Sequence, residues 1–227
     1  MKIALRSRAR DATDILRPFK AKAVTIAQYT LHTQPNLRID HFFDEGRPNK
    51  YLAFVFTPFG NRSLEGNPYG GEFLCRSGFD VISFKNTDDD WFQSVPPAVF
   101  AQIEDQIAGR RYEKRFAYGS SMGGYACFAF SHRLRIDKVF AISPQISIRE
   151  PFDQRWAKRA RSLQWVYEID GMSLARACQF FVLYDPGNVD QQHVDRLSAL
   201  LTDKLHLIKV RFAGHNVALF LRQADAL

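Results

Sequence analysis

The apolar residues of the chain fall into short runs separated by turn residues or by longer stretches of mixed polarity. Runs rich in Val, Ile, Phe and Tyr that turn residues bound predict β-strands. The predicted strands cover residues 23–30, 37–43, 51–57, 79–84, 114–119, 137–143, 179–184 and 205–212. Several of them are almost continuously apolar, which is typical of parallel strands buried on both faces.

Helices are predicted mainly between the later strands, where apolar residues recur three or four positions apart. They cover residues 97–110, 122–133, 153–164, 172–178, 189–202 and 215–226. From residue 79 onward strands and helices alternate, whereas no helix is predicted between the first three strands. This order predicts an α/β fold, a three-layer α/β/α sandwich around a mostly parallel sheet of about eight strands, with an antiparallel or mixed end.

No internal repeat, linker or low-complexity tract interrupts this pattern, so we expect residues 1–227 to form a single domain. Two stretches lie outside the regular alternation. A loop over residues 58–72 is rich in glycine and proline, and it follows a strand at the sheet edge where α/β proteins place ligands. A segment around 146–178 separates two predicted strands and is predicted to be a small cap-like insertion over the site.

Composition excludes several classes of protein. With 227 residues, 46% hydrophobic residues and a net charge of +7, the chain can bury a core and is not intrinsically disordered. No apolar run approaches the roughly 20 residues of a membrane span. The three cysteines are too far apart to favour a disulfide scaffold or a structural zinc site. The first residues lack the apolar core of a secretory signal, so we expect a cytoplasmic protein.

The positive charge is concentrated in residues 1–22 and in a second cluster over residues 149–161. Such clusters bind nucleic acid, anionic membranes or anionic substrates in some proteins, and in many they are only a solvated face. Neither cluster is interleaved with aromatic residues in a recognisable nucleic-acid-binding module. We therefore expect no nucleic-acid partner, and the charge by itself indicates no particular ligand.

The most informative motif is YGSSMGGYACFAF at residues 118–130, which contains Gly-x-Ser-x-Gly centred on Ser121. A predicted strand runs directly into this motif and an apolar helix runs directly out of it. Such a strand–turn–helix holds a nucleophilic serine on a strained backbone at the sheet edge, with glycines where strand and helix would otherwise collide. Ser121 is therefore the candidate nucleophile.

A serine nucleophile needs a histidine base, which in turn needs an acid to orient it. Among the histidines, only His215 follows the last predicted strand, at the same sheet edge as Ser121. Two acids compete for the third position, because Asp185 lies at the end of strand 179–184 and Asp190 lies in the loop beyond it. Asp190 is preferred, although it could cap a helix, and Asp185 could instead form a turn.

An oxyanion hole in such a site uses two backbone N–H groups. One is expected from Met122, the residue after the nucleophile. The other is expected from the loop after strand 51–57, where Phe59 or Gly60 could supply it because Pro58 has no N–H. No His-Gly motif marks the position in this loop. The chemistry requires neither a metal nor an organic cofactor.

With Ser121, an acid and His215 in that chain order, the sequence resembles the α/β-hydrolase fold superfamily from about residue 23 to the end. Three further segments resemble compact bacterial hydrolase-like proteins, some of which accompany glycan or capsule biosynthesis. They are GFDVISFKNTDDDWFQ at 78–93, SPQISI at 143–148 and DQRW at 153–156. This second resemblance implies that Trp91 and Phe92 lie near the substrate pocket.

The sequence thus predicts a carboxylesterase-like serine hydrolase that cleaves an ester or thioester through an acyl-enzyme intermediate. The substrate is expected to be a small-molecule or glycan ester, and the sequence does not define the oligomeric state. Two other hypotheses remain at this stage. The same residues could serve an acyltransferase or a glycan-modification accessory protein, and the scaffold could belong to a non-catalytic binding protein.

Overall fold

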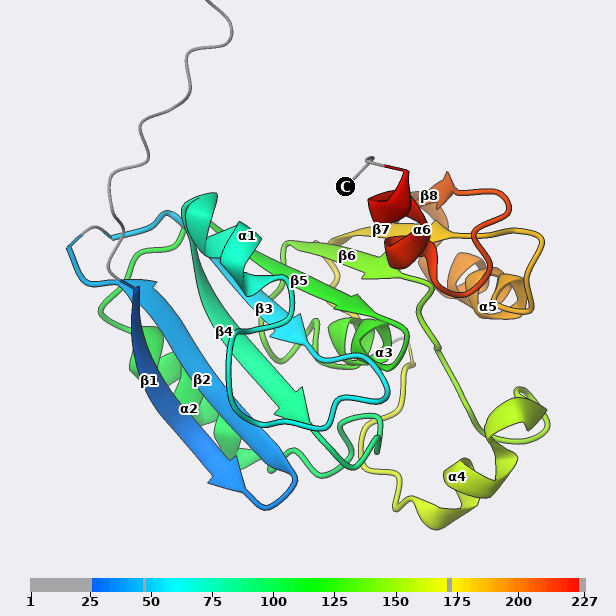
Figure 1. Cartoon of the computed structure of the whole chain (residues 1–227), viewed down its shortest axis with the longest axis horizontal. Helices are drawn as coiled ribbons and strands as arrows, with labels where there is room; N and C mark the ends of the chain where they lie inside the picture. Colours follow the sequence, from blue (N-terminus) through cyan, green and yellow to red (C-terminus); the bar gives the residue numbers. More distant parts are fainter. Residues whose placement is uncertain (1–25, 47, 171–172, 225–227) are drawn as a thin grey trace, which may run out of the picture.

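The computed structural model describes residues 26–46, 48–170 and 173–224. The basic segment at residues 1–22 therefore lies outside the described residues. Within the described part of the chain, eight strands form one sheet in the order β1-β2-β4-β3-β5-β6-β7-β8 (Figure 1). Their bounds are β1 Ile26–Gln34, β2 Leu37–Asp44, β3 Tyr51–Phe56, β4 Phe79–Asn86, β5 Lys114–Ser120, β6 Lys138–Ile142, β7 Gln179–Tyr184 and β8 Leu205–Lys209.

The sheet is mostly parallel, as predicted. Strands β3 to β8 all run in the same direction, and the antiparallel hairpin of β1 and β2 is added at the β4 edge. The carboxyl ends of β5, β7 and β8 consequently lie along one edge of the sheet. Residues that follow these three strands can therefore meet, even though they are far apart in the sequence.

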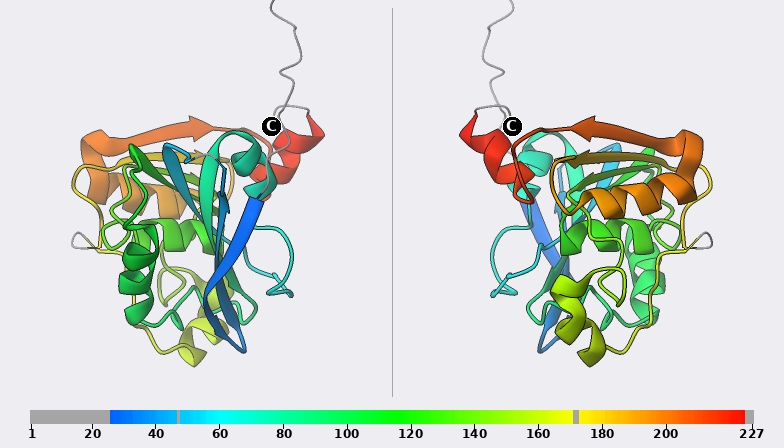
Figure 2. Two further views of the ribbon diagram at one scale, coloured as in Figure 1. Left: turned by 90° about the vertical axis from the view of Figure 1, so that its left-hand side faces the viewer. Right: turned by 90° about the vertical axis from the view of Figure 1, so that its right-hand side faces the viewer.

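Helices cover both faces of the sheet, which confirms the predicted three-layer α/β/α sandwich (Figure 2). The larger core contains residues of α2, α3 and α5 packed on one face, and a smaller cluster under α1 lies on the other. The helix bounds are α1 Gly71–Arg76, α2 Ala98–Ile107, α3 Met122–Ala129, α4 Ala157–Ser162, α5 Gln191–Leu201 and α6 Val217–Gln223. Among the described residues, no helix has the length and apolar character that crossing a membrane requires.

Two sequence predictions about helices were wrong. Helix α1 was not predicted: it begins at Gly71, inside the predicted 58–72 loop, where glycines and prolines suggested irregular backbone, and it ends at Arg76. The helix predicted over 172–178 is absent from the described residues 173–178, which form turns. Its apolar residues Leu174 and Cys178 are buried by turns that cross the α3 side of the sheet, so their spacing reflected burial rather than a helical period.

The segment at 146–178 contains α4 and long irregular stretches, and it extends from the carboxyl edge of the sheet (Figure 1). One buried side chain ties it to the body of the protein. The amide oxygen of Gln93 accepts hydrogen bonds from the backbone N–H groups of Val166 and Tyr167, each at 2.8 Å. The Gln93 amide nitrogen donates to the Tyr167 carbonyl at 3.1 Å, and the hydroxyl of Tyr125 donates to the same carbonyl.

Candidate active site

Ser121 lies at the sharp turn between β5 and α3. Its backbone has φ 53° and ψ −114°, a strained conformation for a residue with a side chain. The turn is held in place because the Ser121 N–H donates to the Ile142 carbonyl at 2.9 Å and the Ser121 carbonyl accepts from Tyr125 at 3.1 Å. The surrounding structure therefore maintains the strain that the sequence motif predicted for the nucleophile.

The glycines of the motif allow strand and helix to approach closely. A Cβ atom on Gly123 would lie 2.4 Å from the Phe56 carbonyl oxygen, and one on Gly119 would lie 2.5 Å from the Gly123 backbone. Such separations are far below van der Waals contact. The close packing at Gly123 also brings the end of β3, and the loop that follows it, next to the N-terminus of α3.

His215 lies in the loop between β8 and α6, and its ring connects Ser121 to Asp190. The distance from His215 Nε2 to Ser121 Oγ is 2.9 Å, and the distance from His215 Nδ1 to Asp190 Oδ2 is 2.6 Å. An ionised carboxylate only accepts hydrogen bonds, so Nδ1 carries the proton and Nε2 accepts from the serine hydroxyl. The Asp190 side chain is only 1% exposed, whereas His215 is 31% exposed.

The two candidate acids have different partners. Asp190 stands immediately before α5, but its carboxylate caps no backbone N–H of that helix and is directed to His215 instead. The Asp185 carboxylate accepts from the N–H groups of Gly187 and Gly214, both at 2.8 Å. Hydrogen bonds from these two N–H groups lower the pKa of Asp185 below its usual value. Asp185 thus forms the turn that the sequence allowed and contacts the loop of His215 through the backbone.

The candidate oxyanion groups come from two neighbouring elements. Met122 is the first residue of α3 and is buried, directly after Ser121. Phe59 and Gly60 follow β3 in the loop that packs near Gly123. The N–H of Gly60 donates to Asp89 Oδ1 at 2.7 Å, so this group is already committed within the protein.

Trp91 and Phe92, which the second resemblance places near the substrate pocket, lie in the turn after β4. Both side chains are fully buried. Phe92 packs edge-on against Phe56 in the core, with ring centroids 5.5 Å apart. Trp91 packs against two aromatic side chains near the site. Its ring centroid lies 5.9 Å from that of Phe59 and 5.2 Å from that of Trp156. The turn that carries both residues is held by Asp90, whose carboxylate accepts from the Phe92 N–H at 2.8 Å.

A cavity of about 290 Å³ does lie beside the candidate oxyanion loop. Its walls include Phe59 and Gly60 together with the polar side chains of Asn61, Asn67 and Tyr69. The Tyr69 ring stacks on Tyr118 with centroids 5.4 Å apart. Burial raises the pKa of Tyr69, and hydrogen bonds with Tyr118 and Ser120 partly oppose this rise. The cavity therefore opens close to the residue that precedes the nucleophile.

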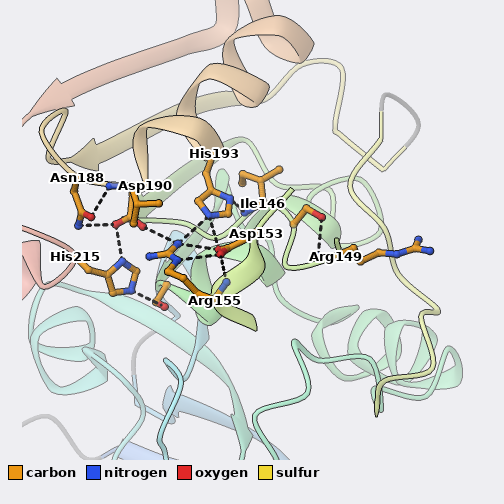
Figure 3. A network of polar contacts seen from close by, with 11 residues as sticks. Ile146, Arg149, Asp153, Arg155, Asn188, Asp190, His193 and His215 are labelled. Atoms are coloured by element: carbon orange, nitrogen blue, oxygen red, sulfur yellow. Dashed lines mark hydrogen bonds and ion pairs between the residues drawn. The ribbon is translucent and has the colours of Figure 1, made fainter. Parts of the chain in front are cut away.

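A second network, which the sequence reasoning missed, lies behind Asp190 (Figure 3). The guanidinium of Arg155 contacts Asp190 Oδ1 at 3.5 Å and donates to both carboxylate oxygens of Asp153, at 3.0 and 2.8 Å. His193 Nε2 lies 3.3 Å from Asp153 Oδ2, and His193 Nδ1 accepts from the Ile146 N–H at 3.1 Å. The sequence showed Arg155 as one member of a basic cluster and as part of the DQRW segment at 153–156, without a role in the site.

The charges of this network follow from its burial. Burial lowers the pKa of His193 to about 4, although Asp153 and Asp190 oppose that change, so the ring is neutral near neutral pH. Burial also raises the pKa of Asp153, but hydrogen bonds and charge from Arg155 outweigh this and leave its pKa below the usual value. Asp153 and Arg155 therefore form an ion pair, and the Asp190 carboxylate is a second, more distant partner of the Arg155 guanidinium.

The described parts of the chain bring no three His, Cys, Asp or Glu side chains together as a metal centre would need. Cys127 and Cys178 are buried, and burial raises their thiol pKa values, so neither supplies a ready thiolate. The side chains that could carry out a reaction at this sheet edge are Ser121, His215 and Asp190.

No family model and no curated protein matches the sequence. Solved structures do match. The fluorophosphonate-binding serine hydrolase FphF of Staphylococcus aureus is 13% identical with a TM-score of 0.57, over 89% of this chain and 96% of that one. The esterase Est22 is 13% identical with a TM-score of 0.54, over 89% of this chain and 76% of that one.

A third match is a chain of the glycosylation associate protein complex Gap123 from Streptococcus agalactiae. It is 14% identical with a TM-score of 0.60, over 87% of this chain but only 44% of that one. At these identities the likeness concerns the fold. The parallel sheet, the strained serine turn after β5 and these structural neighbours agree with the resemblance found in the sequence. The chain has the α/β-hydrolase fold.

Proposed function

We propose that the protein is a serine hydrolase that cleaves a carboxylic ester or thioester through an acyl-enzyme intermediate. The observation that carries the proposal is the continuous contact from Ser121 Oγ to His215 Nε2 at 2.9 Å and from His215 Nδ1 to Asp190 at 2.6 Å. A nucleophile, a base and an orienting acid in this geometry are what acyl transfer requires. The esterases among the structural neighbours support ester hydrolysis as the general reaction.

In the first half of the reaction, Ser121 Oγ attacks the carbonyl carbon while His215 Nε2 takes its proton. The resulting tetrahedral oxyanion collapses, the bond to the leaving oxygen or sulfur breaks, and His215 delivers the proton to that atom. In the second half, water attacks the acyl-serine and gives its proton to His215. The bond to Ser121 Oγ then breaks, and this oxygen recovers the proton.

Asp190 would hold His215 in the tautomer that accepts from the serine and would stabilise the imidazolium that forms. The oxyanion would be bound by the N–H groups of Met122 and Phe59. We favour Phe59 over Gly60 because the Gly60 N–H already donates to Asp89 at 2.7 Å. The positive N-terminal end of α3 would add to the stabilisation of the oxyanion.

The cavity beside Phe59 suggests the kind of substrate. Its volume of about 290 Å³ is small, and its walls combine the aromatic ring of Tyr69 with the amides of Asn61 and Asn67. These walls suit a short acyl group or a polar alcohol, including a glycan ester, better than a long acyl chain. An acyltransferase would use the same residues with another acceptor in place of water, and product analysis with added alcohols or sugars would distinguish the two reactions.

The experiment that tests the proposal is labelling with a fluorophosphonate probe, which reacts with an activated serine. Wild-type protein and Ser120→Ala should be labelled, because only the preceding residue changes in this matched control. Ser121→Ala should not be labelled, and His215→Ala should be labelled far more slowly. Absence of labelling in the folded wild-type protein would contradict the proposal and favour a non-catalytic binding protein.

A further inference from the structure

We propose that Arg155 is a positioning residue, which holds the carboxylate of Asp190 in place and couples the 146–178 segment to the chemistry of His215. This inference rests on the proposed function, because it assigns Arg155 a role behind the acid of that site. Arg155 itself contacts neither Ser121 nor His215 in any interaction that the structure shows. It acts through Asp190.

The first argument is the division of the Asp190 carboxylate between two partners. Its Oδ2 atom accepts from His215 at 2.6 Å, and its Oδ1 atom faces the Arg155 guanidinium at 3.5 Å. A carboxylate held at both oxygens cannot rotate freely about its Cβ–Cγ bond. Asn188 adds a longer contact to Oδ2 at 3.5 Å. The orientation of His215 therefore depends on a group supplied by a distant part of the chain.

The second argument is that Arg155 is itself rigidly held. Asp153 accepts from two guanidinium nitrogens at 3.0 and 2.8 Å, and it also accepts from the backbone N–H of Arg155 at 3.1 Å. His193 supports Asp153 from α5, and the Ile146 N–H fixes the tautomer of that histidine. A surface arginine that only solubilises the protein would need none of these partners. The Asp153 side chain is 1% exposed and the Arg155 side chain 36% exposed, so a buried carboxylate holds a guanidinium that is partly open to solvent.

The third argument is the charge balance around His215. The groups facing it are the Ser121 hydroxyl from the β5–α3 turn and the Asp190 carboxylate from the β7–α5 loop. Behind Asp190 stand the Arg155 cation, the Asp153 anion and the neutral His193. With Arg155 present, this cluster carries one net negative charge before His215 is protonated, and none afterwards. Without Arg155 it would carry two negative charges, and no cation would stand between the carboxylates of Asp153 and Asp190.

The test compares Arg155→Gln and Arg155→Lys with wild-type protein, and Arg161→Gln is the matched control. Arg161 lies in the same segment and pairs with Glu150 at the surface, so its loss removes an equal charge without touching Asp190. The first readout is the NMR resonance of the His215 Nδ1 proton, which reports its hydrogen bond to Asp190 and is assigned with a His215→Asn variant. This measurement needs no enzymatic activity and therefore separates the inference from the proposed function.

In Arg155→Gln we expect the NMR resonance of the His215 Nδ1 proton to move away from its wild-type position, because the Asp190 carboxylate loses one of its two partners. Arg155→Lys should keep this resonance near its wild-type position, because the positive charge remains. On an activated ester, kcat of Arg155→Gln should fall about tenfold. Arg161→Gln should leave both the resonance and kcat unchanged. An unchanged resonance in folded Arg155→Gln would overturn the inference, even if the wild-type protein is labelled by fluorophosphonate.

Discussion

The Asp185 carboxylate accepts a hydrogen bond from the Gly214 N–H at 2.8 Å, and this contact fastens the loop that carries His215 to the end of β7. Asp185 is thus adjacent to the base in space without touching its ring. The distinction between Asp185 and Asp190 has a kinetic consequence, since one acid holds the loop and the other holds the ring.

Replacement of the two acids should therefore give losses of different size. Asp190→Asn should lower kcat by about 10³ to 10⁴, because an amide cannot stabilise the imidazolium and favours the wrong tautomer. Asp185→Asn should lower kcat only about 10-fold to 100-fold, through a displaced His215. Steady-state kinetics on an activated ester would measure both. If Asp185→Asn were the more damaging variant in kcat, the assignment of Asp190 as the acid would be wrong.

The crossing of β3 and α3 at Gly123 should tolerate no side chain. In Gly123→Ala the new methyl group would meet the Phe56 carbonyl at 2.4 Å, so we expect unfolding free energy to fall by about 2 to 3 kcal/mol. The control is Gly109→Ala, where no atom lies within 4 Å of the new methyl and stability should change by less than about 1 kcal/mol. Denaturant unfolding would measure both variants, and equal stability would contradict the proposed crowding.

The small cavity beside Phe59 leads to a prediction about substrate length. Esters of two-carbon or four-carbon acids should react about tenfold faster, in kcat/KM, than an eight-carbon ester, because the cavity of about 290 Å³ leaves little room for a longer chain. Tyr69→Ala should narrow this difference by opening one wall. The exposed Tyr29→Ala variant on β1 is the control, and it should keep the wild-type preference. A wild-type preference for the eight-carbon ester would show that this cavity does not bind the acyl group.

The buried His41 on β2 should make stability depend on pH. Burial lowers its pKa from 6.5 to about 4, with Arg110 adding to that effect and Asp80 opposing it. As pH falls from 6.5 to about 4, the unfolded chain takes up a proton that the folded protein does not, so unfolding becomes easier. In His41→Phe, the decrease in unfolding free energy between neutral pH and pH 4 should be smaller by about 3 kcal/mol than in the wild-type protein. Unfolding free energies measured at pH 7 and at pH 4.5 would detect it, and parallel pH profiles for both proteins would refute it.

Much of the fold followed from local sequence patterns. Strand 179–184 was predicted at its observed bounds, because an apolar run buried between two neighbouring strands is easily distinguished from its polar flanks. Helix α1 was missed because it begins at Gly71, after a left-handed Gly70, where glycines usually indicate a turn. The helix expected at 172–178 was wrong, since burial of Leu174 and Cys178 does not require a helical period.

Some residues of the candidate site could likewise be identified from the sequence, and others could not. Ser121 and His215 were identifiable because Ser121 directly follows β5 and His215 lies in the loop after β8, and both strands end at the same sheet edge. The structure brings both together with Asp190. The sequence did not decide between Asp185 and Asp190, because the path of the loop after β7 determines which carboxylate reaches His215. Arg155 could not be recognised, because it reaches Asp190 from an irregular segment 35 residues away. The turn after β4, which carries the buried Trp91, likewise left no local pattern.

The attachment of the 146–178 segment through Gln93 bears on how substrates would enter and leave. The Gln93 amide accepts two hydrogen bonds and donates one, at 2.8 to 3.1 Å, and all three would have to break for this segment to move away. Each broken hydrogen bond would leave a polar group unpaired inside the protein, so such a movement is energetically costly. The segment is therefore anchored at Val166 and Tyr167, and we expect turnover to be limited by the bond-making steps and by diffusion rather than by displacement of this anchor. Solvent viscosity should then affect the rate only as it affects diffusion.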